Sequence, residues 1–145
     1  MSIGGIYGAY GQARVSKSKA YSRALDEYIK AVYPKGTAKP DTLFIGKNEH
    51  MDGVKLPGVV QGATVDLLTS EDAQKKLSYR RSLIYLNIVG WLDKHTAEFL
   101  IVTFLEFKPQ RHCYLYFTNA AGGEMKLDSL RFKYPYGNTR KVKAK

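Results

Sequence analysis

The chain has 145 residues, of which 44% are hydrophobic and 25% are charged, and its formal net charge is +10 at pH 7. This length predicts a single domain, and this composition excludes an intrinsically disordered chain. No apolar run approaches the ~18 residues that a membrane-spanning helix needs, so a helical membrane span is excluded as well.

The positive charge and the cysteine content restrict the possible partners and the possible kinds of site. A positive field attracts nucleic acid, anionic lipid or an acidic protein without selecting among them. Cys113 is the one cysteine, which excludes an internal disulfide and a thiolate metal cluster. Its place in the apolar run 113–117 predicts a buried small hydrophobic residue rather than a catalytic thiol.

The first 15 residues are rich in glycine and tyrosine, and we expect a flexible tail at 1–15. They lack the basic region and the full hydrophobic region of a signal peptide. The run from Gly8 to Ala13 nevertheless has the small-residue composition of a cleavage site. The protein is therefore expected to be exported or periplasmic if this run ends a truncated leader, and cytoplasmic otherwise.

The segment 19–33 predicts an amphipathic helix of about four turns, with Ser16 or Ser18 as its N-cap. Pro34 and Gly36 end it. Apolar residues recur at the spacing of one helix face: Tyr21, Ala24, Leu25, Tyr28, Ile29 and Val32. Because the opposite face carries acids as well as bases, we expect this helix to cover a sheet rather than a membrane surface.

Two short strands are predicted next, at 42–45 and 63–68. The first leads into 46–53, a polar loop with glycine at each end. After the second, 69–72 has the composition of a helix start, and 73–77 would be a short helix.

The second half predicts strands at 83–91, 99–107, 112–117 and 125–134, with the polar link 93–96 between the first two. The strand at 99–107 is apolar on both faces. Such a strand is usually central and covered on both sides, or lies where a sheet curls around a cavity.

This order of elements predicts an α+β fold, with one long N-terminal amphipathic helix packed on a curved antiparallel sheet that ends in a four-stranded meander. The single α+β domain would span 16–136. The remaining residues, 137–145, are polar and basic, and we expect a solvated C-terminal tail there.

Over Ser16–Tyr134 the element order resembles that of the cystatin-like and nuclear-transport-factor-2-like group, in which a helix packs into a cone-shaped sheet. Cystatins carry a Q-x-V-x-G hairpin and a Pro-Trp loop. Here 57–62 hold similar residues in another order, and Trp91 follows Gly90, so the resemblance does not imply protease inhibition. Members of the broader group serve as enzymes, transport or secretion adaptors and immunity proteins, so the resemblance implies a fold and no single function.

Glu49, His50 and Asp52 form the strongest polar cluster, inside the loop 46–53. A histidine between carboxylates is typical of a general base, and the same side chains can ligate a metal ion. The alternative is ordinary loop composition. Nucleotide-binding glycine loops, serine nucleophile elbows and zinc-protease motifs are absent from the sequence, which favours a protein without catalysis, cofactor or metal.

The candidate binding residues are aromatic and basic. Strand alternation places Tyr114 and Tyr116 on one face of their strand, and Arg131 and Lys133 on one face of the next. If these faces coincide, they form one aromatic and basic surface, with Trp91 nearby, of the composition that interfaces favour. The alternative is that the tyrosines are half-buried residues suited to strands.

These observations predict a non-catalytic binding module that presents an aromatic-basic sheet face, or the mouth of the cone, to an acidic protein or anionic polymer. One alternative is a small-molecule-binding protein or enzyme with a pocket between helix and sheet. Tyr21, Tyr28, Trp91 and Phe104 would line that pocket, with His50 as its polar group. A second alternative is nucleic-acid binding. The oligomeric state is left open.

Overall fold

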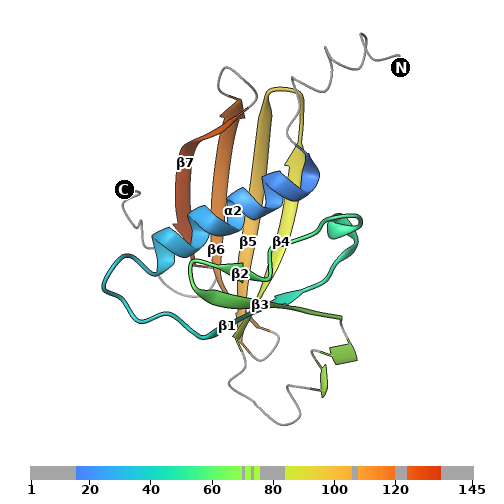
Figure 1. The fold of residues 1–145 in the computed structure, drawn as a ribbon, viewed down its shortest axis with the longest axis vertical. Helices are drawn as coiled ribbons and strands as arrows, with labels where there is room; N and C mark the ends of the chain where they lie inside the picture. Colours follow the sequence, from blue (N-terminus) through green and yellow to red (C-terminus); the bar gives the residue numbers. More distant parts are fainter. Residues whose placement is uncertain are drawn as a thin grey trace.

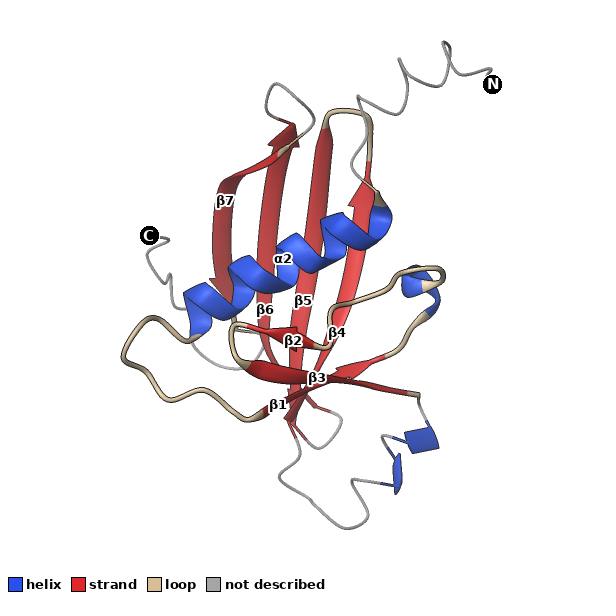
Figure 2. Ribbon diagram, in the orientation of Figure 1, coloured by secondary structure: helices blue, strands red, loops and turns tan. Residues whose placement is uncertain are grey.

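The computed structural model describes residues 16–69, 71–72, 74–75, 84–105, 108–119 and 124–134. The tails predicted at 1–15 and 137–145 lie outside these ranges. In the described part, one long helix, α2, lies across one face of a seven-stranded sheet (Figures 1 and 2). The predicted α+β class is therefore confirmed.

The helix α2 spans Lys17–Val32, and its N-cap is Ser16, whose hydroxyl oxygen accepts a hydrogen bond from the Lys19 backbone N–H at 3.2 Å. Ser18, the other candidate cap, instead accepts from the Lys55 backbone N–H at 2.8 Å. The predicted apolar face is largely buried: Ala20, Tyr21, Ala24, Leu25, Tyr28 and Ile29. The helix ends at Val32, and its C-cap is Tyr33, just before Pro34.

The strands are β1 (Thr42–Gly46), β2 (Val59–Val60), β3 (Ala63–Leu68), β4 (Ile84–Leu92), β5 (Thr96–Leu105), β6 (Lys108–Asn119) and β7 (Met125–Lys133). A short 3-10 helix, η1 (Glu49–Met51), follows β1. After β3, Thr69 and Asp72 exchange hydrogen bonds at 3.1 and 3.4 Å between the backbone N–H of each and the side chain of the other. This reciprocal pair confirms the predicted helix start.

The sheet order is β2-β3-β1-β4-β5-β6-β7, and the sheet is mixed rather than wholly antiparallel. The prediction of an antiparallel sheet is wrong at β1, which pairs in parallel with both β3 and β4. Parallel neighbours need a long crossover connection, which residues 47–62 and 69–83 supply. The strands β1, β2 and β3 turn away from the direction of β4–β7 (Figure 1).

From β4 onward, each strand pairs antiparallel with the next in the sequence. The β5–β6 register shifts between Thr103 and Phe104, where Pro109 enters the ladder. A proline has no N–H to donate, so it is tolerated at such a bulge, and β6 begins at Lys108 rather than near the predicted residue 112.

The core lies between α2 and the sheet face that it covers, called the inner face here. Tyr21 meets Phe99 edge to face at 5.0 Å between ring centroids, and Phe99 meets Phe117 in the same way at 6.0 Å. The Tyr21 hydroxyl accepts from the Gly90 backbone N–H at 2.9 Å. Arg23 donates to the Met125 backbone carbonyl at 3.0 Å, which ties α2 to β7.

Candidate functional site

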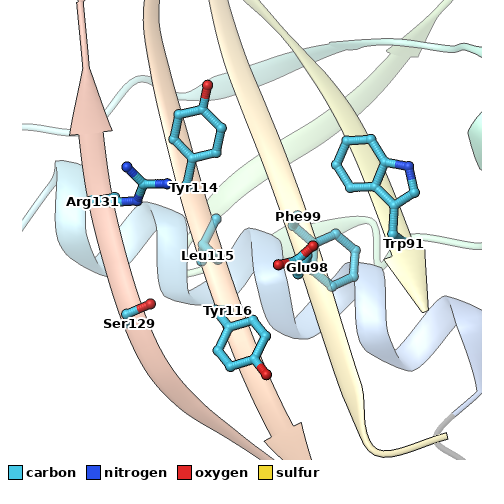
Figure 3. A pocket seen from close by; sticks show the side chains of 8 residues that line it. All are labelled: Trp91, Glu98, Phe99, Tyr114, Leu115, Tyr116, Ser129 and Arg131. Atoms are coloured by element: carbon cyan, nitrogen blue, oxygen red, sulfur yellow. The ribbon is translucent and has the colours of Figure 1, made fainter. Parts of the chain in front are cut away.

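The outer face of the sheet, opposite α2, holds a depression of about 420 Å³. Figure 3 shows its side chains with α2 behind the sheet. The residues that line it come from four adjacent strands: Trp91, Glu98, Phe99, Tyr114, Leu115, Tyr116, Ser129 and Arg131. Of these, Phe99 and Leu115 are buried in the core. Strand register brings them together, because Glu98 lies opposite both Trp91 and Tyr116, and Tyr114 lies opposite Arg131.

The predicted aromatic and basic residues share this outer face. The guanidinium carbon of Arg131 lies 4.8 Å from the centre of the Tyr114 ring, in cation–π contact. Lys133 lies two residues beyond Arg131 on β7, opposite His112, and so on the same face. Four of the five predicted residues line the depression, whereas Lys133 lies farther along β7 and is not among its lining residues.

Trp91 is the most unusual residue of this face, because 53% of its surface is exposed. Large aromatic side chains carry much apolar area, and contiguous exposed apolar surface marks interaction sites. Glu98 stands directly opposite Trp91, so the depression has an acidic end at β4–β5 and a basic end at β7.

Much of the positive charge of the chain belongs to residues outside the described ranges. Eight basic residues fall outside the described ranges, against the single acid Glu106: Arg14, Lys76, Arg80, Arg81, Arg140, Lys141, Lys143 and Lys145. The described outer face is therefore distinguished by its aromatic residues and by Arg131 and Lys133, rather than by a concentration of charge.

Glu49, His50 and Asp52 lie in and beside η1, and all three are exposed. The hydrogen bonds found at His50 involve its backbone, whose N–H donates to the Asn48 side chain and whose carbonyl accepts from Tyr21. Among the described residues, no group of three His, Cys, Asp or Glu side chains is placed to hold a metal ion. These three residues therefore form an exposed turn, in which only the neighbouring Met51 is buried.

A second, smaller cavity of about 80 Å³ lies between α2 and the inner face of the sheet. Its lining includes Tyr28, Thr103 and Arg111. Of the residues predicted to line a helix–sheet pocket, Tyr28 does so. Tyr21 is fully buried in the core, whereas Trp91 lines the depression on the outer face.

The other two predicted members also lie apart from the cavity. Phe104 stacks on Tyr85 at 5.2 Å between ring centroids, and His50 is exposed. Arg111 was not predicted as a site residue. Its position two residues before Cys113, in the inward series of β6, is the signal that could have identified it.

Burial shifts the ionisation of two residues near this cavity. It raises the pKa of the Cys113 thiol to about 12, against a smaller opposing effect of Arg111. The residue is fully buried, as predicted, so it is not poised as a nucleophile. Burial also raises the pKa of Tyr28, although Arg111 and the hydrogen bond with Thr103 act in the opposite direction.

Comparison with protein-family models, with curated proteins and with solved structures found no match to this chain. The resemblance to the cystatin-like and nuclear-transport-factor-2-like group therefore stays a prediction from element order. No helix in the described ranges is long and apolar enough to cross a membrane.

Proposed function

We propose that the protein is a non-catalytic binding module whose outer sheet face receives an acidic segment of a partner protein. The observation that carries this proposal is the grouping of exposed Trp91 with Tyr114, Tyr116 and Arg131 around one depression. Tryptophan, tyrosine and arginine are the residues that contribute most binding energy at protein interfaces.

The charges of the depression give the partner segment a direction. Carboxylates of the partner would meet Arg131 and Lys133 at β7, where arginine can bind a carboxylate with two parallel hydrogen bonds. Apolar side chains of the partner would cover Trp91. Because Glu98 lies beside Trp91, acidic groups are disfavoured at that end and hydrogen-bond donors are favoured.

Peptides selected from a displayed random library against the full chain test this function. We expect the selected peptides to combine aspartate or glutamate with apolar residues. Trp91 is the only tryptophan, so its fluorescence reports occupation of the depression directly. Binding should shift the emission to shorter wavelength as the indole leaves water.

Charge-reversal variants supply the control. Arg131→Glu combined with Lys133→Glu should weaken peptide binding by about tenfold or more. Lys35→Glu combined with Lys47→Glu makes the same change in net charge at exposed loop positions outside β4–β7 and should leave affinity unchanged at moderate salt. Selection of no peptide, or of peptides indifferent to the Arg131 and Lys133 changes, would contradict the proposal. Oligonucleotide binding with a strong salt dependence would favour the nucleic-acid alternative instead.

A further inference from the structure

Arg111 on β6 is held on the inner face of the sheet, beneath the C-terminal half of α2. Its Nη2 donates to the Tyr28 hydroxyl at 2.8 Å and, more weakly, to the Thr103 hydroxyl at 3.5 Å. The guanidinium carbon lies 5.8 Å from the centre of the Tyr28 ring and 5.4 Å from that of Phe132. The cation is thus fixed between two aromatic rings.

This cation lacks an anionic partner in the described part of the chain. The ion pairs found there join other residues, and no described carboxylate lies within 4.0 Å of Arg111. Its Nε atom is buried and makes no hydrogen bond. Arg111 as a whole is partly buried, but leaving its buried Nε–H without an acceptor costs free energy, which the two aromatic contacts offset only in part.

Beside Arg111, one hydroxyl proton of the Tyr28–Thr103 pair is also without an acceptor. The Tyr28 and Thr103 hydroxyl oxygens lie 2.8 Å apart and share one hydrogen bond, in which either oxygen can be the donor. Arg111 donates to both oxygens, so whichever hydroxyl accepts the shared bond keeps its own proton free. Arg111 Nε–H and one hydroxyl proton therefore have no acceptor among these three side chains.

All three side chains line the cavity of about 80 Å³, whose other walls are mostly apolar. These walls are Tyr33, Pro40, Thr42, Leu43, Phe44, Ile84 and Leu86. A space of this size holds several water molecules, and so has room for a carboxylate with a short apolar chain rather than for a nucleotide. Ile84 is 55% exposed, which places solvent at that side of the cavity.

We infer that this cavity is a binding site for a small apolar monocarboxylate, whose carboxylate bonds to Arg111 and to the Tyr28–Thr103 hydroxyl pair. Its hydrocarbon part lies against Leu43 and Leu86. The planar guanidinium suits a carboxylate, and a carboxylate accepts hydrogen bonds without needing a proton of its own. This site lies on the opposite face of the sheet from the proposed protein-binding depression, so the two proposals stand or fall separately.

Binding of butyrate to the full ¹⁵N-labelled chain, followed by NMR, tests the site. Butyrate should shift the Arg111 Nε–H signal and the backbone signals of Thr103 and Arg111. Butyramide, which has the same shape without the charge, should bind at least about tenfold more weakly, because hydrogen bonds to charged groups are the stronger ones. Inorganic phosphate tests whether the site prefers a larger anion.

The variants separate the site from general packing. Arg111→Met should lower butyrate affinity by about tenfold or more, and Tyr28→Phe, a milder change, by about threefold. The matched control is Arg23→Met. Arg23 is also a partly buried arginine over an aromatic ring, Phe117, but it is paired with Glu27 at 2.8 Å. The Arg23→Met substitution should leave butyrate affinity unchanged.

Four results would overturn the inference. Equal binding of butyrate and butyramide would mean that the cavity is merely apolar, and tighter phosphate binding would assign another ligand class. A rise in butyrate affinity in Glu106→Gln would mean that a carboxylate of the chain itself occupies the site. Absence of any shift with butyrate in the wild-type chain would exclude the site altogether.

Discussion

Gly90 occupies a position of β4 where no side chain fits. A Cβ atom there would lie 2.5 Å from Phe99 Cε1 and 3.0 Å from Tyr21 Cζ, both atoms of buried rings. We predict that Gly90→Ala lowers the free energy of unfolding by about 2 kcal/mol, because the rings must shift to admit the methyl group.

The matched control for this change is Gly58→Ala. A Cβ atom at Gly58 meets nothing within 4 Å. Its effect should stay within about 0.5 kcal/mol. Urea unfolding at unchanged m-value measures both, and equal shifts of the two midpoints would show that β4 and α2 pack less closely than described.

Cys113 gives the stability of the protein a dependence on alkaline pH. Burial raises the pKa of its thiol from 9.0 to about 12, so above pH 9 the unfolded chain loses this proton before the folded chain does. The contribution of the Cys113 thiol to the free energy of unfolding is complete below pH 9 and is lost as the pH rises toward 12. The expected slope reaches about 1.4 kcal/mol per pH unit.

The free energy of unfolding of Cys113→Ala, measured across the same pH range, is compared with that of the wild-type chain. In this variant the decline should begin only above pH 10, where Tyr21, Tyr28 and Tyr85, whose pKa values burial raises, start to act in the same sense. Identical pH profiles between pH 9 and 10 would contradict the assignment to Cys113.

At the scale of elements, the start of α2 depends on one side chain. Ser16 accepts from the Lys19 backbone N–H, and the first turn of the helix holds no acidic residue. Ser16→Ala should lower the free energy of unfolding by about 1 kcal/mol. Ser16→Asp keeps the acceptor and adds a favourable charge at the N-terminal end of the helix, so it should keep or raise stability. Thermal unfolding distinguishes this cap from a general intolerance of change at residue 16, which would lower both variants.

For the whole molecule, the basic C-terminal residues and the outer face should act on different steps of binding. Residues 138–145 contain four basic residues and no acid, with Val142 and Ala144 as their apolar members. We predict that deleting Asn138–Lys145 leaves the melting temperature unchanged and slows association with an acidic peptide, chiefly at about 50 mM salt.

Trp91→Ser should instead shorten the lifetime of the complex, because buried contacts set dissociation.

Stopped-flow fluorescence measures association for the deletion, and surface plasmon resonance measures dissociation for Trp91→Ser. A melting temperature several degrees lower after the deletion would mean that these residues pack on the domain, and the predicted boundary at 137 would then be wrong.

The sequence by itself determined which residues point inward, because the alternation of a strand and the periodicity of a helix are local properties of the backbone. Cys113 is buried as predicted, Leu115 and Phe117 are buried with it, and α2 begins at one of the two expected caps. The same alternation placed Tyr114 and Tyr116 on the other side of β6, facing away from the core.

Only the tertiary structure decided which of these faces meet. The parallel pairing of β1 depends on the path of its connections, and the grouping of Trp91 with Tyr114 depends on register across three strands. Arg111 shows the same limit, because strand alternation directs it inward, whereas its hydrogen bond to Tyr28 depends on how α2 lies across the sheet. Local patterns fix the face of a residue, whereas its neighbours across the sheet are set by pairings between residues that are distant in the sequence.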